Sequence, residues 1–138
     1  MKPFKLHILI ISLFLLTITA WSQNQKIDQA RVNFISQKLQ LSQAESQKFW
    51  PVYNEYLDKI KSIRHQRKKM FQEFDYSQNP ADAEQFLKTF NQLELAEYQI
   101  KNEYSQKFKQ IIGVVKTAHL FKAEEEFRLE LVKILKSD

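Results

Sequence analysis

Apolar residues in the middle of the chain recur at alternating steps of four and three. The first such stripe consists of Phe49, Tyr53, Tyr56, Ile60, Ile63, Arg67, Met70 and Phe74. The second consists of Phe86, Phe90, Leu93, Glu97, Ile100, Tyr104 and then Phe108 or Ile111. This spacing places each set on one face of a helix. We therefore predict two long amphipathic helices, each with one charged residue within its apolar stripe.

The two long helices are joined by a short connection, Ser77-Gln78-Asn79-Pro80. Asn79 suits the N-cap of the second helix, and proline is favoured at the first helical position. Asp82 and Glu84 then lie where the helix dipole favours negative charge. Because a connection this short joins neighbouring helices, we expect the long pair to form an antiparallel hairpin.

A helix boundary is predicted by Leu41-Ser42-Gln43-Ala44-Glu45, which has the pattern of a capping box. The Ser42 side chain would accept from the Glu45 amide, and the Glu45 side chain from the Ser42 amide. The first long helix therefore begins at Gln43. Upstream, residues 27–40 form a short amphipathic helix with an apolar side made by Val32, Ile35 and Leu39.

Gly113 is the only glycine in the chain and the best candidate for a left-handed helix terminator. It would end the second long helix after Ile112 and allow a last helix over about 116–136. The predicted fold is all-α, with four helices, two short and two long.

The N-terminus has the pattern of a cleavable secretory signal. Lys2 and Lys5 precede an apolar run over 8–18, which is followed by Ala20-Trp21-Ser22. The run has about half of the roughly 20 residues needed to cross a bilayer. We expect residues 1–22 to be a signal peptide and residues 23–138 to be one helical-hairpin domain, exported to the periplasm and soluble after cleavage.

Composition narrows the possible chemistry. The chain has no cysteine, one glycine and three prolines, which disfavours sheets and excludes disulfides and glycine-rich phosphate loops. Its formal charge of +5 falls to +3 without the two lysines of the signal. The predicted domain is therefore mildly basic and depends on packing for its stability.

No arrangement of residues suggests catalysis or metal binding. The sequence has neither a Ser-His-Asp order nor a His-Glu-x-x-His motif. His65 and His119 both lack a second metal ligand three or four residues away. The run from Glu124 to Glu126 is most simply a solvated helix face. We therefore predict a protein that is not an enzyme and has neither a cofactor nor a metal site.

The most biased stretch is a basic collar within residues 59–69, which contain no acid. Its members are Lys59, Lys61, Arg64, His65, Arg67, Lys68 and Lys69. One interpretation is a solvated charged face. The other is a binding surface for acidic, partly unfolded polypeptide, because apolar residues follow closely. Nucleic acid is not expected as a partner, since the chain is exported and has no recognition motif. The residues predicted to bind protein are Arg64, Arg67, Lys68, Met70, Phe71 and Phe74.

Two stretches resemble a known family. Leu41-Ser42-x-x-Glu45, followed by Phe49-Trp50-Pro51-Val52-Tyr53-Asn54-Glu55-Tyr56, resembles the first signature of the Spy/CpxP-like periplasmic family, whose motif is Leu-Thr-x-x-Gln. Ser42 and Glu45 differ from the family residues but keep the capping chemistry. The stretch Ala118-x-x-Phe121-x-Ala123-Glu124-Glu125-x-Phe127-x-x-Glu130-Leu131 resembles the closing helix of small exported proteins labelled sensors of ECF-type sigma factors.

The resemblance implies a helical-hairpin subunit that dimerises into a curved cradle. It also implies a holdase-like chaperone of the envelope-stress response, which shields unfolded envelope proteins without ATP. The alternative that it leaves open is a sensor or regulatory component of an ECF sigma-factor or metal-stress pathway, and a purely structural dimer is a third. The expected partners are unfolded or specific envelope proteins and a second copy of the chain, with the membrane reached only through a partner protein.

Overall fold

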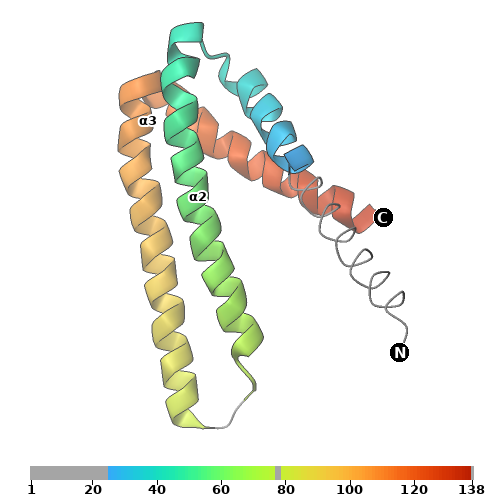
Figure 1. Ribbon diagram of the computed structural model, residues 1–138, viewed down its shortest axis with the longest axis vertical. Helices are drawn as coiled ribbons and strands as arrows, with labels where there is room; N and C mark the ends of the chain where they lie inside the picture. The colour runs from blue at the N-terminus through green and yellow to red at the C-terminus, as the bar shows by residue number, and fades with distance from the viewer. Residues whose placement is uncertain (1–24, 77–78, 138) are drawn as a thin grey trace, which may run out of the picture. The chain divides into compact units, whose positions relative to one another are not determined.

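The computed structural model describes residues 25–76 and 79–137. All regular elements in these two ranges are helices: residues 25–39, α2 (Gln43–Glu73) and α3 (Pro80–Ser137), as Figure 1 shows. The prediction of an all-α fold is confirmed. The predicted signal peptide, residues 1–22, lies outside the described residues.

The number of helices differs from the prediction, because the described residues form three helices and not four. The expected third and fourth helices are a single element, α3, whose backbone leaves helical geometry at Gly113. Gly113 has φ 76° and ψ 166°, a conformation that is essentially restricted to glycine and is not the left-handed helical one we expected. The helix resumes at Val114, and the hydroxyl of Thr117, four residues after the glycine, donates to the Gly113 carbonyl oxygen at 2.8 Å. A glycine in this conformation interrupts a helix without inserting a linker.

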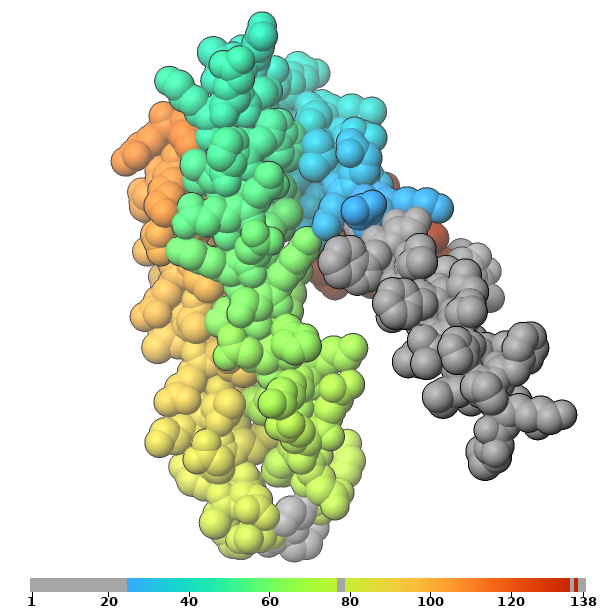
Figure 2. All heavy atoms as spheres, viewed as in Figure 1, coloured from blue at the N-terminus to red at the C-terminus, as the bar shows by residue number. Residues whose placement is uncertain are grey.

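The chain forms two compact units, one of which is Leu41–Ala118. In this unit α2 and residues 80–112 of α3 lie side by side and run in opposite directions (Figures 1 and 2). The rings in contact between the two helices include Phe49 with Phe108, Tyr56 with Tyr104, and Phe74 with Phe86. The two apolar stripes therefore face each other along the length of α2.

The start of α2 is fixed by a complete capping box. The Glu45 amide donates to Ser42 Oγ at 3.2 Å, and the Ser42 amide donates to Glu45 Oε2 at 2.7 Å. This agrees with the start at Gln43 that the sequence predicts. Leu41, which precedes the cap, is half-buried.

Glu45 also pairs with Lys116, just beyond the break at Gly113. Lys116 Nζ lies 2.9 Å and 2.7 Å from the two carboxylate oxygens of Glu45. The hydrogen bond from Lys116 and the amide of Ser42 together lower the pKa of Glu45 to about 2. The carboxylate therefore caps α2 and joins it to the segment that follows the break in α3.

The N-cap predicted for α3 is also present. Asn79 Oδ1 accepts from the Ala81 amide at 3.0 Å, Pro80 is the first helical residue, and Asp82 lies in the first turn. Between α2 and α3, residues 77–78 lie outside the described part of the chain.

The second unit contains residues 25–40 and 119–137. Its core includes Ile35, Leu39, Leu120, Ala123 and Phe127, all at most 5% exposed. The Phe34 and Phe127 rings lie 5.7 Å apart, and Lys38 Nζ pairs with Glu126 Oε2 at 2.9 Å. The short helix predicted over 27–40 is present as residues 25–39, with Ile35 and Leu39 buried and Val32 half-buried.

Candidate protein-binding surface

Arg67 is held between the two helices of the unit Leu41–Ala118. Its Nη2 lies 2.5 Å from Glu97 Oε2 and 2.8 Å from Glu94 Oε1. The Glu97 side chain is only 11% exposed and also pairs with Lys101 Nζ at 2.6 Å. Burial raises the pKa of Glu97, but the hydrogen bonds from Lys101 and Arg67 outweigh it and leave the pKa below its usual value.

The sequence contains a signal for this ion pair. Each apolar stripe has one charged residue, Arg67 in the first and Glu97 in the second, and their charges are opposite. Because facing stripes bury such residues together, their pairing satisfies both charges. Arg67 thus contributes to the packing of α2 on α3, in addition to any role in binding.

The other predicted site residues lie on two different sides of α2. Arg64, Lys68 and Phe71 are spaced i, i+4, i+7 along the helix, which places them on one face. Gln66, Met70 and Glu73 have the same spacing two residues further on. Two residues correspond to about 200° around a helix, so the two series lie on nearly opposite faces.

The first of these faces, Arg64, Lys68 and Phe71, is called here the basic–apolar face. Phe71 is 52% exposed, although its ring lies 5.5 Å from Phe86 and 6.2 Å from Phe90. Arg64 and Lys68 are exposed, and neither forms an ion pair with any of the residues that the structure describes. The face therefore presents one large aromatic side chain beside two cations.

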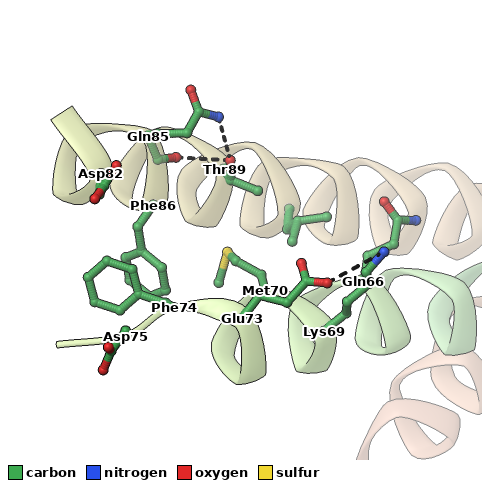
Figure 3. A pocket seen from close by; sticks show the side chains of 11 residues that line it. Gln66, Lys69, Met70, Glu73, Phe74, Asp75, Asp82, Gln85, Phe86 and Thr89 are labelled. Atoms are coloured by element: carbon green, nitrogen blue, oxygen red, sulfur yellow. Dashed lines mark hydrogen bonds and ion pairs between the residues drawn. The ribbon is translucent and has the colours of Figure 1, made fainter. Parts of the chain in front are cut away.

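Met70 and Phe74 instead line an open cavity of about 570 Å³, which we call the loop-end cavity (Figure 3). Its apolar lining is Met70, Phe74, Phe86 and Leu93, and its acidic lining is Glu73, Asp75 and Asp82. The Phe74 and Phe86 ring centroids lie 4.2 Å apart where α2 ends and α3 begins. Arg64, Arg67, Lys68 and Phe71 do not line it.

The six predicted residues therefore occupy three environments: an ion pair between helices, an exposed face and a cavity. The pattern of the sequence did not lead us to predict the acidic side chains of the cavity. A usable signal existed, because Glu73, Asp75 and Asp82 flank the connection immediately after the acid-free basic collar. Only the folded chain shows that acids from both sides of the connection line one cavity.

Other members of the basic collar make local contacts. Lys59 Nζ lies 3.5 Å from Glu55 Oε1 and 5.1 Å from the Tyr104 ring centroid. Lys69 Nζ lies 3.7 Å from Glu73 Oε1. His65 is exposed. The collar is thus divided between solvated cations, local ion pairs and the pair made by Arg67.

Neither a candidate metal site nor a candidate membrane span is present in the described residues. Residues 25–76 and 79–137 contain no group of three or more histidine, cysteine, aspartate or glutamate side chains placed to hold a metal ion. Within the same ranges, no helix combines the length and the apolar character required to cross a bilayer.

Comparison of the chain with protein-family models, with curated proteins and with solved structures finds no match. The resemblance to the Spy/CpxP-like family and to sensors of ECF-type sigma factors stays a prediction.

Proposed function

We propose that this chain is a periplasmic envelope-stress protein of Spy/CpxP type, which binds unfolded or partner proteins without ATP as a holdase-like chaperone. One observation carries the proposal: the basic–apolar face presents Phe71, more than half exposed, beside the two solvated cations Arg64 and Lys68. An unfolded acidic polypeptide offers the complementary groups, apolar side chains and carboxylates.

The expected strength of one such contact is small. Completing the burial of a half-exposed phenylalanine contributes roughly 1 kcal/mol, and each exposed charge pair less than about 1 kcal/mol. Weak contacts suit a chaperone, because clients must be released without an energy source. Because each contact is weak, a protein that presents two such faces to one client binds it more tightly than a protein with one face.

The proposed binding unit is therefore a dimer of helical hairpins. Each hairpin consists of α2 and residues 80–112 of α3, and two of them form a curved dimer that offers two basic–apolar faces to one client. The dimer is checked by measuring the mass of residues 23–138 in solution by light scattering. A monomer at the concentration that protects a client would contradict the two-face arrangement.

The function is tested by titrating residues 23–138 against a chemically denatured acidic model client in the absence of ATP. Light scattering follows the aggregation of the client. We expect protection near stoichiometric ratios. A folded protein that gives no protection at a large excess would contradict the proposal.

The site is tested with the variant Arg64→Glu, Lys68→Glu, Phe71→Ser. Arg67 is left unchanged, because its substitution would also break the ion pairs with Glu94 and Glu97. The variant should keep its helical content and lose most of its protection. A matched control, Lys48→Glu with Lys88→Glu, reverses two exposed cations elsewhere on α2 and α3. Equal losses in both variants would show a general charge effect instead of this site.

A second candidate is a sensor or regulatory component of an ECF sigma-factor or metal-stress pathway. It is favoured by the stretch 118–131, where Ala123 and Phe127 are buried while Glu130 is exposed on the surface. A neighbouring gene for an ECF sigma factor or its inhibitor, together with specific capture of that inhibitor by the purified chain, would favour this role. A free-standing, stress-induced gene would favour the chaperone.

A further inference from the structure

The loop-end cavity has a charge opposite to that of the chain. The whole sequence has a formal charge of +5, whereas three carboxylates, Glu73, Asp75 and Asp82, and a single ammonium group, Lys69, line the cavity. Lys69 Nζ lies 3.7 Å from Glu73 Oε1, so its charge is partly offset by that carboxylate. The cavity therefore keeps a local excess of negative charge.

The cavity also has an apolar floor. Figure 3 shows Met70 reaching from α2 toward α3, beside the rings of Phe74 and Phe86. Its volume of about 570 Å³ lies within the range of about 300–1,000 Å³ that is usual for binding pockets. A bulky apolar side chain placed there would cover Met70 and the two rings.

The uncharged polar side chains of the cavity are already hydrogen-bonded. Gln66 Nε2 donates to Ser62 Oγ at 3.4 Å. Gln85 Nε2 donates to Thr89 Oγ1 at 3.1 Å, and Thr89 Oγ1 donates to the Gln85 carbonyl oxygen at 2.9 Å. Because these groups are occupied, selectivity comes mainly from the carboxylates and the apolar floor. This combination favours a ligand that is both apolar and cationic.

We propose that the loop-end cavity is a second binding site, whose ligand is a cationic–apolar peptide segment. A leucine, isoleucine or phenylalanine side chain of the segment packs on Met70, Phe74 and Phe86. A lysine or arginine within two or three residues of it pairs with the carboxylates of Glu73, Asp75 and Asp82. This goes beyond the proposed holdase activity, since the basic–apolar face on the nearly opposite side of α2 prefers segments of the opposite charge.

The probe is a pair of fluorescein-labelled twelve-residue peptides with identical leucine and phenylalanine positions, one with lysine and the other with glutamate between them. Fluorescence polarisation measures their affinity for residues 23–138. We expect the lysine peptide to bind about tenfold more tightly, with a difference that shrinks as salt increases. Equal affinity for the two peptides would overturn the proposal. It would also be overturned if a variant in which Arg64 and Lys68 are neutralised bound the glutamate peptide more tightly than the lysine peptide.

A charge-matched pair of variants locates the site. Glu73→Gln with Asp82→Asn removes two charges from the cavity and should weaken the lysine peptide about fivefold. Asp58→Asn with Glu84→Gln removes two exposed charges that do not line the cavity, and should leave the affinity unchanged. Equal weakening by the two pairs would overturn the assignment.

A steric variant separates this site from the proposed function. Thr89→Trp places an indole in the cavity and should weaken the lysine peptide more than about tenfold, while protection of an acidic client stays unchanged. The variant Arg64→Glu, Lys68→Glu, which keeps Phe71 against Phe86, should show the reverse pattern. Circular dichroism confirms that each variant is folded. A folded Thr89→Trp protein that binds the lysine peptide normally would overturn the cavity site, whatever the outcome for the chaperone.

Discussion

The two ends of the α2–α3 pair contain similar aromatic residues in very different environments. At one end, which we call the closed end, Phe49, Tyr53, Tyr104 and Phe108 are all 0% exposed. At the connection end, Phe74, Phe86 and Phe90 are half-buried and Phe71 is 52% exposed. Yet the ring contacts across the helices are alike, since Phe49–Phe108 and Phe71–Phe86 both have centroids 5.5 Å apart.

The difference shows that two rings in contact can still be exposed to solvent, unless other side chains pack over them. At the closed end, Lys59 and Lys107 lie over the Tyr104 ring, with Nζ at 5.1 Å and 4.3 Å from its centroid. Long cationic side chains can shield an aromatic surface in this way while their charges stay in water. At the connection end, Arg64 and Lys68 are solvated beside Phe71. The same mixture of aromatic and basic residues therefore leaves no ring exposed at one end and leaves an exposed ring beside two cations at the other.

The largest expected effect is at the closed end. Phe108→Ala should lower the free energy of unfolding by about 3–5 kcal/mol, because it removes a fully buried ring from a cluster of four. Phe71→Ala should cost less than about 1 kcal/mol, because that ring is already half-solvated. Urea denaturation of both variants measures the difference. Similar losses would show that the two ends are equally well packed.

A smaller effect is expected between the two ends, at the ion pair of Arg67 and Glu97. Glu97→Leu alone should cost about 2–4 kcal/mol, because it leaves the guanidinium, 24% exposed, without its closest partner. Arg67→Met combined with Glu97→Leu should recover most of this loss. A double-mutant cycle in urea measures the coupling. Additive losses would mean that the pair contributes nothing to the joining of the helices.

A substitution of Gly113, close to the closed end, is expected to lower the free energy of unfolding by a smaller amount. A Cβ built at this residue meets no atom within 4 Å, so Gly113→Ala carries no steric clash. Its φ of 76° is nevertheless unfavourable for alanine, at a cost of about 1–3 kcal/mol. Thermal unfolding measures the loss. An unchanged midpoint would indicate that the backbone adopts another conformation there without penalty.

The smallest effect is a pH dependence at the start of α2. Glu45 has a pKa of about 2 when folded, below its usual value of 4.5. Its charge therefore stabilises the fold fully above the usual value, and this contribution is lost as the pH falls from about 4.5 toward 2. Glu45→Gln should be less stable than the natural chain at pH 7, by a margin that shrinks over this range. Urea denaturation at pH 7, 4 and 2.5 measures the margin; a margin that grows on acidification would contradict the assignment.

Much of the helical structure could be predicted from local patterns. The capping box of Ser42 and Glu45 gave the start of α2, and Asn79 with Pro80 gave the start of α3. The predicted break at Gly113 is present, but the prediction of four helices was wrong, because a glycine in a sequence indicates freedom at φ without specifying ψ. At Gly113 the chain adopted a conformation from which the helix resumes at once.

The candidate site was less predictable. The sequence grouped Arg67 with Met70, Phe71 and Phe74 because all four are close together along one helix. Their separation into an ion pair, a cavity and an exposed face depends on how α2 is rotated against α3. No pattern within α2 alone predicts how this helix is rotated against α3.

The sequence by itself determined that this chain is helical, where α2 and α3 begin, and which face of each is apolar. These properties follow from caps and from a period of 3.6 residues, which act over a few neighbouring residues. Only the tertiary structure decided that Arg67 meets Glu97, 30 residues away, and that Phe108 is covered while Phe71 is not. Such outcomes depend on the register and rotation of one helix against another, because burial is a property of residues that are distant in the chain.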